Sequence, residues 1–364
     1  MTANIDIPGE MKAAKLCEYN KPYELGTKEV PTISDHELLV QVYAAGFCHS
    51  DLQVMHGQFE SKLPLIPSHE PAGKIVKVGA KCGSKWRIGD RVGVLNFKNS
   101  CKTCTGCKLS KREYGTYDPR FCETREMAGF KHDGAFAEYM VADPETTVKL
   151  PESLSFEQAA PLMCAGATVW GALEKATTGL RPGETVAVVG IGGLGHLGVQ
   201  FAKALGYRTI AIDSKPEGRQ LATNVSSPDL LPDLVVDSMS TDAKQKIFDF
   251  THREGVAAAV VCTDSLPANE WTLSLLRIGG TLVLLGLPPD KWRFDSDIIV
   301  FRELILRGSY VASRESTERM MAVVKENDVQ SQLTLVPFDK VPGIVDMYLH
   351  KSFSGRIVVQ ILEE

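Results

Sequence analysis

The second half of the sequence alternates short apolar β runs with helical stretches, and this alternation constrains the fold more than any other feature. The runs typical of buried strands occupy residues 185–189, 209–212, 234–236, 258–261 and 281–285. Strands that alternate with helices in this way pair in parallel. The sequence therefore predicts an α/β fold with a doubly wound parallel sheet in this region.

A glycine-rich motif directly follows the first of these runs. Its residues are Gly190, Ile191, Gly192, Gly193, Leu194 and Gly195. A G-x-G-x-x-G motif alone is a weak signal, but here it stands between a strand and a helix predicted for residues 194–205, the context that dinucleotide binding requires. The glycines allow a tight turn, so that a pyrophosphate can approach the free N–H groups at the helix N-terminus. A glycine-rich turn without a ligand is the structural alternative.

Asp213 ends the next predicted strand and bears on the choice of cofactor. A carboxylate at this place accepts hydrogen bonds from the adenosine ribose and repels a 2′-phosphate, so it favours NAD over NADP. Lys215 and Arg219 follow closely and belong to the same candidate site. Because both are cations, NADP stays open.

The first 150 residues have a different texture. Short β-like runs at residues 38–45, 73–78 and 136–141 are broken by Gly, Pro and Asp, which predicts a strand-rich domain with long loops. Ser155, with Gln158 three positions on, is an N-cap signal that predicts a helix running through Cys164.

Two pairs of residues in this strand-rich part are candidate metal ligands. Cys48 is followed by Asp51, and His69 is followed by Glu70. Thiolate and imidazole suit Zn²⁺, and nearby carboxylates can orient such ligands or serve as a spare one. Cys164 is the best candidate for a third ligand, although alone it would be a core residue. A Cys₂His set leaves one position open, which is typical of catalytic zinc.

A second cluster consists of Cys101, Cys104, Cys107 and, after fourteen intervening residues, Cys122. Four thiolates can close a tetrahedral zinc site, which would pin the loop of residues 97–123. The same thiolates could ligate an iron–sulfur cluster, and buried or oxidised cysteines are the structural alternative.

Composition excludes several classes of protein. At 364 residues the chain should form about two domains. The net charge of −5, without a basic stripe, argues against a nucleic-acid partner, and no apolar run approaches the roughly 18 residues of a membrane span. Residues 1–10 show no secretory or transit signal, and nine cysteines, an odd number, do not indicate a disulfide scaffold. We therefore expect a cytoplasmic protein.

These motifs occur in the order that is found in zinc-dependent medium-chain alcohol dehydrogenases, and the chain most resembles the yeast and bacterial type. The resemblance runs from Met11 to the end and includes the segments 308–311 and 354–356. It implies a GroES-like β-rich catalytic domain formed by residues 1–165 and 312–364. It also implies a Rossmann NAD-binding domain formed by residues 166–311.

The resemblance also implies roles for single residues. Two zinc ions are expected: a catalytic one on Cys48, His69 and Cys164, with Glu70 able to exchange onto it, and a structural one on Cys101, Cys104, Cys107 and Cys122. Asp51 would orient His69. His49 and Arg356 match positions that contact the pyrophosphate, and Thr168 matches one beside the nicotinamide. His196, in the glycine motif, is assigned only a packing role.

The implied reaction is reversible hydride transfer between an alcohol carbon and NAD, with zinc as Lewis acid. Ser50 would take the proton of the alcohol and pass it through the nicotinamide ribose to His56. The structural alternatives are a turn serine for Ser50, a loop-end histidine for His56 and a solvated surface cation for Arg356.

Four features depart from the family pattern or define the substrate pocket. Ser68 stands where the family usually has Gly, and the stretch from Cys107 to Cys122 is about twice the usual length. Asn96 replaces a large aromatic residue that commonly lines the pocket, while Phe59 matches a second pocket position. A smaller, polar Asn96 predicts a pocket wider or more polar than one built for ethanol.

Other functions remain open at this point. An NADP-linked cinnamyl-type aldehyde reductase and a polyol dehydrogenase would use the same zinc chemistry. A non-catalytic dinucleotide-binding protein would be expected to have lost catalytic residues, whereas every candidate is present here. The expected partners are a small-molecule alcohol or aldehyde and, by resemblance, further copies of the chain in a homodimer or homotetramer built through the Rossmann sheet edge.

Overall fold

The alternating segment after Thr185 folds into a parallel sheet in the computed structural model, which describes residues 6–364. The described chain divides into unit 1, residues 6–164, 313–318 and 333–364, and unit 2, residues 165–312 and 319–332. This division assigns residues 319–332 to unit 2, whereas the expected Rossmann domain ends at residue 311; the exact domain boundaries stay a prediction. The expectation that residues 1–10 carry no secretory or transit signal concerns, in part, residues 1–5, which lie outside the described residues.

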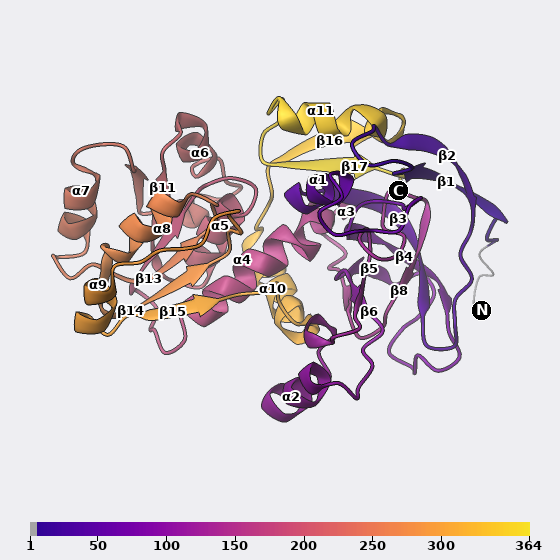
Figure 1. The fold of residues 1–364 in the computed structure, drawn as a ribbon, viewed down its shortest axis with the longest axis horizontal. Helices are drawn as coiled ribbons and strands as arrows, with labels where there is room; N and C mark the ends of the chain where they lie inside the picture. The colour runs from indigo at the N-terminus through magenta and orange to yellow at the C-terminus, as the bar shows by residue number, and fades with distance from the viewer. Residues whose placement is uncertain (1–5) are drawn as a thin grey trace. The chain divides into compact units, whose positions relative to one another are not determined.

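Unit 2 contains a six-stranded parallel sheet with the order β12-β11-β10-β13-β14-β15 (Figure 1). The first strand along the chain is central and the order reverses beside it, as in a Rossmann fold. The strands are β10 (Thr185–Val189), β11 (Arg208–Asp213), β12 (Leu234–Asp237), β13 (Val256–Val261), β14 (Leu276–Leu284) and β15 (Ile305–Gly308). The helices are α4 (Ala165–Ala176), α5 (Gly195–Ala204), α6 (Pro216–Leu221), α7 (Ala243–Phe250), α8 (Leu266–Leu273) and α9 (Ser296–Phe301), with the 3₁₀ turn η3 (Pro228–Leu230).

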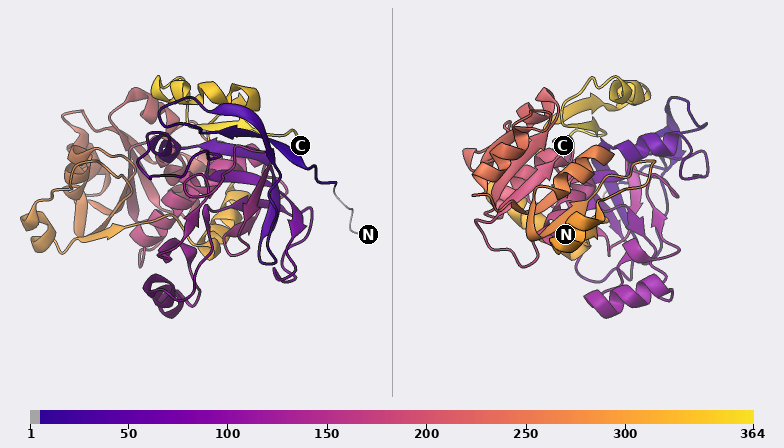
Figure 2. Two further views of the ribbon diagram at one scale, coloured as in Figure 1. Left: turned by 45° about the vertical axis from the view of Figure 1, so that its right-hand side comes forward. Right: turned by 60° about the vertical axis from the view of Figure 1, so that its left-hand side comes forward.

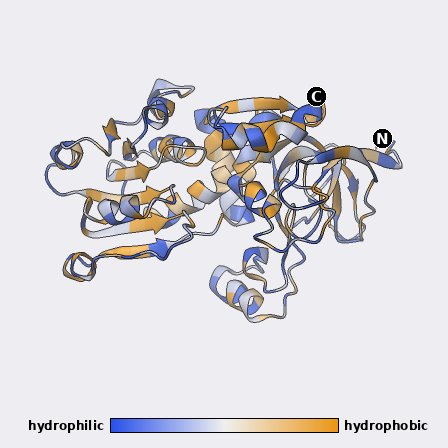
Figure 3. Ribbon diagram, turned by 45° about the horizontal axis from the view of Figure 1, so that its top comes forward, coloured by the Kyte–Doolittle hydropathy of each residue, from blue (hydrophilic) through white to orange (hydrophobic). Residues whose placement is uncertain are grey.

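Helices cover both faces of this sheet because its strands are apolar on both sides. Val188 in β10 packs with Val199 of α5, whereas its neighbour Val189 packs in the cluster that contains Ile247 of α7 and Leu273 of α8. The views of Figure 2 show helices on either side of the strands, and Figure 3 shows the strands as predominantly hydrophobic. A sheet buried in this way explains why its strands read as continuous apolar runs in the sequence.

Unit 1 is built around a seven-stranded sheet with the order β16-β17-β3-β4-β5-β9, in which β8 also pairs with β3. Its strands are β3 (Leu38–Phe47), β4 (Glu70–Val78), β5 (Arg91–Val94), β8 (Tyr139–Ala142), β9 (Thr147–Lys149), β16 (Leu333–Pro337) and β17 (Arg356–Gln360). Two smaller sheets pair β1 (Glu10–Lys15) with β2 (Glu24–Glu29) and β6 (Phe97–Lys98) with β7 (Glu126–Met127). The helical segments are α1 (His49–Met55), α2 (Thr105–Tyr114), η1 (Pro119–Phe121), α3 (Phe156–Ala159), η2 (Ala160–Met163), η4 (Phe338–Gly343) and α11 (Ile344–Leu349). Helix α10 (Arg314–Asn327) begins in unit 1 and continues in unit 2.

Two predicted elements differ from the sequence expectation. The predicted helix from Ser155 through Cys164 is only the short α3, followed by the 3₁₀ turn η2. Pro161 lies in η2 and has no N–H for an α-helical hydrogen bond, which accounts for the change. The strand expected at residues 136–141 starts at Tyr139, because Ala137 instead forms an isolated bridge with Ala13.

No helix among residues 6–364 is long and apolar enough to cross a membrane.

We expect the core of unit 1 to be sensitive to truncation of Leu39, which lies in β3 and is 2% exposed. Leu39→Ala should lower the free energy of unfolding by about 2–5 kcal/mol, because the buried side chain leaves a cavity. Leu25→Ala is the matched control, since Leu25 in β2 is 42% exposed and should change it by less than about 1 kcal/mol. Urea denaturation followed by circular dichroism measures both values. Equal shifts would contradict the placement of Leu39 in the core.

Candidate active site and metal centres

The first metal-ligand cluster forms where β3 ends and β4 begins. Cys48 follows β3 and is the N-cap of α1, while Glu70 opens β4 and is the register partner of Gly46. The antiparallel pairing therefore brings His69 and Glu70 beside Cys48. Cys164 follows η2, and one ligand atom each of Cys48, His69, Glu70 and Cys164 lies within 4.8 Å of the others. The His69 Nε2 atom is 3.3 Å from the Cys164 Sγ atom.

Asp51 holds this cluster together from inside α1. Its Oδ2 atom accepts a hydrogen bond from the Cys48 N–H at 2.8 Å, and its Oδ1 atom accepts from the Ser68 N–H and from His69 Nδ1, each at 3.1 Å. Asp51 is fully buried. Because Nδ1 of His69 carries the proton that Asp51 accepts, Nε2 is left to face the cluster as a ligand.

Ser68 has a backbone conformation that accounts for the glycine usual at this position of the family. Its φ is +73°, in the region that favours glycine, and the residue is fully buried. The Ser68 hydroxyl donates a hydrogen bond to the Gly46 carbonyl at 2.8 Å. These contacts hold a conformation that would otherwise be unfavourable for a serine.

Glu70 forms a buried ion pair with Arg356 from β17. Arg356 is only 6% exposed, so the structure excludes the solvated surface cation considered for it. The guanidinium contacts the Oε1 atom of Glu70, whereas Oε2 has no hydrogen-bond partner among the described residues. A buried carboxylate oxygen without a partner is costly, and a cation between the four ligand atoms would satisfy it.

The ionisable groups of the cluster shift one another. The hydrogen bond between the two thiols lowers the pKa of Cys48 well below its usual value and raises that of Cys164. Burial raises the pKa of Glu70 to about 7, although Arg356 opposes the shift. Burial disfavours protonation of His69, but the Asp51 carboxylate and Cys48 together outweigh burial and raise the pKa of the imidazole. The four ligand atoms lie together, and a metal cation would favour the deprotonated form of the thiols and the carboxyl group.

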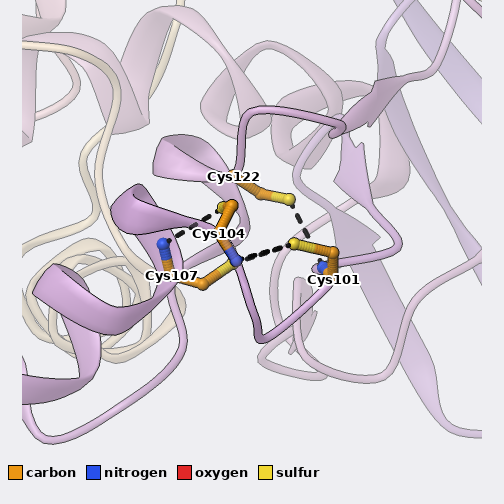
Figure 4. A group of neighbouring side chains, drawn as sticks. All are labelled: Cys101, Cys104, Cys107 and Cys122. Atoms are coloured by element: carbon orange, nitrogen blue, oxygen red, sulfur yellow. Dashed lines mark hydrogen bonds between the residues drawn. The ribbon is translucent and has the colours of Figure 1, made fainter.

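The second cluster brings the four cysteines of the long loop together (Figure 4). Their Sγ atoms lie within 4.8 Å of one another, and the structure places Cys122 among them despite its distance in sequence. Backbone N–H groups point at the sulfurs: Cys104 N–H donates to Cys101 Sγ at 3.3 Å, Cys107 N–H to Cys104 Sγ at 3.4 Å, and Cys101 N–H to Cys122 Sγ at 3.3 Å. Such donors stabilise thiolates, the form in which cysteine binds metals.

The long stretch between Cys107 and Cys122 is taken up by α2 and η1. Figures 1 and 2 show α2 apart from the strands of unit 1. Gly106 makes the return possible, because a Cβ atom there would lie 1.8 Å from the Phe121 carbonyl oxygen. Asp118, which is buried, starts η1 and pairs with Arg120. The extra length therefore forms an ordered helix and turn that bring Cys122 to the cluster.

Two thiols of this second cluster have strongly shifted and opposite pKa values. Hydrogen bonds from Thr103 lower the pKa of Cys101 to about 5, whereas burial raises that of Cys107 to about 12. A metal ion would hold all four sulfurs as thiolates and remove this asymmetry.

Unit 2 has a cavity of about 540 Å³ at the carboxyl ends of its central strands. Its lining includes Val189, Gly190, Ile191, Gly192, Asp213, Ser214, Lys215, Gly218, Ser238, Met239, Cys262, Thr263, Ser265, Pro267, Ala268 and Trp271. A Cβ atom on Gly195 would lie 2.1 Å from the Gly190 carbonyl oxygen, so the loop can close on α5 only with glycine there. A Cβ atom on Gly192 would meet nothing within 4 Å, which leaves room for a ligand against the backbone. The loop and the cavity thus fit a dinucleotide.

The charged residues near this cavity have different partners. The Asp213 carboxylate accepts hydrogen bonds from the Ile191 N–H at 2.6 Å and from the Lys215 N–H at 2.8 Å. Arg219 pairs with Asp237 at 3.1 Å and donates to the Asp213 carbonyl at 3.1 Å, and it is not part of the cavity lining. Lys215 is exposed and lines the cavity.

The predicted proton-relay residues lie on or next to α1. Ser50 is half-buried in the first turn, and His56 is the exposed C-cap, where its Nδ1 atom contacts the Asn20 Oδ1 atom at 2.7 Å. Residues six apart on a helix are about 240° apart around its axis, whereas Gln53 lies on the same face as Ser50. The helix α1 therefore does not place the side chains of Ser50 and His56 next to each other.

The two remaining predicted cofactor contacts lie in different units. His49 is exposed at the start of α1, with its ring centroid 6.2 Å from that of Tyr348. Thr168 is half-buried in the first turn of α4. Neither lines the cavity of unit 2.

Sequence reasoning missed Phe130, which packs against His69. The two ring centroids are 5.1 Å apart, and Phe130 also packs edge-on against Phe59 at 4.9 Å. Asn96 is tied to the same segment, because its carbonyl accepts a hydrogen bond from the Ala128 N–H at 2.9 Å. The available signal was a lone aromatic residue in a glycine-rich loop, which does not indicate a position beside the metal ligands.

Comparison with known proteins connects both units to one family. The sequence matches the alcohol dehydrogenase GroES-like domain over residues 34–152 and the zinc-binding dehydrogenase domain over residues 193–326. An alcohol dehydrogenase of Geobacillus stearothermophilus is 38% identical over 353 residues, covering 96% of this chain and all of the relative.

Solved structures give the same result. The alcohol dehydrogenase of the archaeon Aeropyrum pernix superposes with a TM-score of 0.81 at 30% identity, covering 96% of this chain and 99% of that one. A cinnamyl alcohol dehydrogenase of Sorghum bicolor superposes with a TM-score of 0.82 at 25% identity, covering 98% and 99%. The expected fold class, a GroES-like β-rich domain with a Rossmann domain, is confirmed.

The chain therefore belongs to the zinc-dependent medium-chain alcohol dehydrogenase family. Its activity is that of a zinc-type alcohol dehydrogenase, an oxidoreductase that uses zinc and a nicotinamide dinucleotide on a small-molecule alcohol.

Metal analysis of cysteine variants would test the two clusters separately. We expect about two zinc ions per chain in the purified protein, and about one in each of Cys164→Ser and Cys104→Ser, because each removes one thiolate ligand from one cluster. Cys164→Ser should abolish turnover, whereas Cys104→Ser should mainly lower the thermal midpoint. Cys17→Ser, at an exposed cysteine outside both clusters, is the control. Iron in place of zinc at the second cluster, or an unchanged zinc content in either variant, would contradict the assignment.

Proposed function

We propose that this enzyme is an NAD-linked alcohol dehydrogenase and aldehyde reductase with one catalytic and one structural zinc ion per chain. The observation that carries the catalytic assignment is that the ligand atoms of Cys48, His69 and Cys164 lie close together in space. One of these residues, Cys48, precedes Ser50 by two positions in the sequence. The chemistry of these donors fits Zn²⁺, and the partnerless Oε2 atom of Glu70 fits a nearby cation.

The chain's own residues prepare the site for the reaction. When bound, zinc supplies Lewis acidity toward the alcohol or aldehyde oxygen, and the dinucleotide accepts or donates the hydride. Asp51 keeps Nε2 of His69 turned to the metal position, while Arg356 holds one oxygen of Glu70. Phe130 and Phe59 provide an apolar wall beside His69, which excludes water from the place where the hydride moves.

The charges around Asp213 support NAD rather than NADP. The carboxylate lies at the cavity and would repel a 2′-phosphate. Of the two cations that could offset it, Arg219 is already paired with Asp237. Among the described residues that line the cavity, Lys215 is the only cation, which leaves the local charge balance in favour of a ribose with a free 2′-hydroxyl.

Ser50 and His56 are the proposed proton carriers, together with the cofactor ribose. We infer that the Ser50 hydroxyl, two residues after the proposed ligand Cys48, holds the proton of the alcohol. Asn20 accepts a hydrogen bond from Nδ1 of His56, which leaves Nε2 of that imidazole able to take up a proton. His49, Thr168 and Arg356 are proposed contacts of the dinucleotide.

The substrate is proposed to be larger or more polar than ethanol. Asn96 stands where an aromatic side chain commonly fills the pocket. Phe59 and Phe130, which pack against each other, still provide aromatic side chains for a pocket wall. Branched and aromatic aldehydes should therefore be reduced at least as efficiently as acetaldehyde.

Association and location complete the proposal. Strand β15 is the last strand of its sheet. Ile305 in β15 is 42% exposed, and Val300 and Phe301 at the end of the preceding helix α9 are 66% and 80% exposed. An apolar sheet edge of this kind supports a homodimer or homotetramer formed through it. A monomeric mass by light scattering would refute it. We place the enzyme in the cytoplasm, because all nine cysteines are free thiols, as expected in a reducing compartment; cell fractionation would test this.

The activity and its cofactor can be tested in one assay. We expect purified protein to consume NADH with short, branched and aromatic aldehydes, to use NADPH at least about tenfold less efficiently, and to lose turnover on chelation of zinc. Asp213→Ser should raise the relative use of NADPH by roughly tenfold, because the repulsion of the 2′-phosphate is removed.

Asp229→Ser, in the turn η3 away from the cavity lining, is the control and should leave the ratio unchanged. Turnover that survives zinc removal would contradict the zinc mechanism. A wild-type preference for NADPH would contradict only the cofactor assignment.

The relay can be tested by two substitutions. Ser50→Ala should lower kcat for alcohol oxidation at neutral pH by about 10²–10⁴-fold, because the proton of the alcohol loses its acceptor. His56→Gln should lower it by less, and imidazole in the buffer should restore part of the rate. His350→Gln, at the exposed C-cap of α11, is the control. If His56→Gln behaves like this control, the proton leaves by a route that does not include His56.

A further inference from the structure

His196, in the first turn of α5, has a set of contacts that its packing role does not explain. It is 2% exposed. Its Nδ1 atom lies 2.9 Å from the Gly192 carbonyl oxygen, and its Nε2 atom lies 3.0 Å from Ser331 Oγ. The Gln332 N–H also donates to Nε2, at 3.3 Å.

These partners determine where the proton of the imidazole lies. A backbone N–H can only donate, so Nε2 must accept from Gln332 and carries no proton. The carbonyl oxygen of Gly192 can only accept, so Nδ1 carries the proton and donates it. The neutral imidazole is therefore held in one tautomer by partners on both sides.

The bond to Gly192 fixes one peptide of the dinucleotide loop. The Gly192 carbonyl accepts from both the backbone N–H of His196, at 3.2 Å, and its side chain. Because a trans peptide is planar, its N–H points opposite to its carbonyl. Holding the Gly192 carbonyl against α5 therefore turns the Gly193 N–H outward, on the side where Gly192 is exposed to the cavity.

The other side of the imidazole binds the segment at which the chain leaves unit 2. Unit 2 ends at Gln332, and Ser331 is 3% exposed. Gln200, one turn after His196 and also buried, reinforces the contact: its side chain donates to the Gln330 carbonyl at 2.8 Å and accepts from the Gln330 N–H at 3.1 Å. The buried polar face of α5 thus binds three consecutive residues of this segment.

We propose that His196 is a positioning residue for the cofactor, which orients the Gly192–Gly193 peptide toward the dinucleotide and anchors that loop to Ser331 and Gln332. This inference rests on the proposed binding of a nicotinamide dinucleotide in unit 2. It gives the histidine of the glycine motif a role in cofactor affinity, through the loop and without contact with the reacting atoms.

Three substitutions separate the two sides of the imidazole. Asn carries an amide nitrogen at the distance of Nδ1 from Cβ, so His196→Asn can keep the donor to Gly192. Gln carries an amide oxygen at the distance of Nε2, so His196→Gln can keep the acceptor for Ser331 and Gln332. His196→Leu removes both. Titration calorimetry with NADH gives the dissociation constant of each variant, and thermal unfolding gives its stability.

We expect His196→Leu and His196→Gln to weaken NADH binding by about tenfold, and His196→Asn by less than about threefold, because the buried side-chain hydrogen bond to the Gly192 carbonyl is lost in the first two and can be kept in the third. The KM for NADH should rise in parallel, while kcat at saturating NADH stays within about twofold of wild type. The order of affinities should differ from the order of thermal midpoints, since Gln retains contacts that Asn loses.

Wild-type affinity in a folded His196→Leu variant would overturn the inference. Equal weakening by Asn and Leu, or affinities that simply follow the thermal midpoints, would also overturn it in favour of a packing role. Failure of the wild-type protein to bind NADH would instead overturn the proposed cofactor, and so is distinguishable.

Discussion

The three hydrogen bonds accepted by the buried carboxylate of Asp51 are the interaction on which the metal-ligand cluster of unit 1 depends. They come from the backbone of Cys48, the backbone of Ser68 and the imidazole of His69, which belong to two separate stretches of chain. One side chain thus sets the start of α1, the strained turn before β4 and the orientation of a metal ligand. A buried carboxylate is tolerable only when its oxygens are satisfied, and here the required donors are the groups that the cluster must position.

Unit 2 uses a carboxylate in a similar way. Asp213 accepts from the backbone of Ile191 in the glycine loop and from that of Lys215 at the start of α6, so it organises the loop while presenting a negative charge to the cavity. Gly218 allows this arrangement, because a Cβ atom there would lie 2.5 Å from the carboxyl group. In both units an acidic side chain fixes the backbone around a candidate binding site. Asp51 thereby orients the candidate metal ligands, and Asp213 shapes the glycine loop at the cavity. Substituting either residue would therefore alter local structure as well as charge.

The sequence was sufficient for features that depend on local spacing. Apolar runs predicted β10 and β11, and the glycine motif predicted the turn into α5, since each follows from neighbouring residues alone. The cysteine pattern predicted the four-cysteine cluster, including Cys122, which lies further along the chain than the other three. Long-range contacts had no such signal. The pairing of Glu70 with Arg356, the packing of Phe130 on His69 and the contact of His196 with Ser331 all join distant segments. The break at η2 had a local signal in Pro161, which the prediction from the N-cap pattern at Ser155 did not use.

The position of Arg356 in the sequence has a consequence for the order in which the parts of the protein fold as the chain is synthesised. Arg356 lies 286 residues after Glu70, in the strand that inserts between β16 and β3, and all of unit 2 is synthesised between them. Until β17 emerges and docks, the nascent sheet has an open edge at β3, and Glu70 lacks its counter-charge. Contacts of such large sequence separation form late and slowly. The metal-ligand cluster therefore reaches its final charge balance only after unit 2 has been made, and metal binding at this cluster is expected to follow translation of that unit.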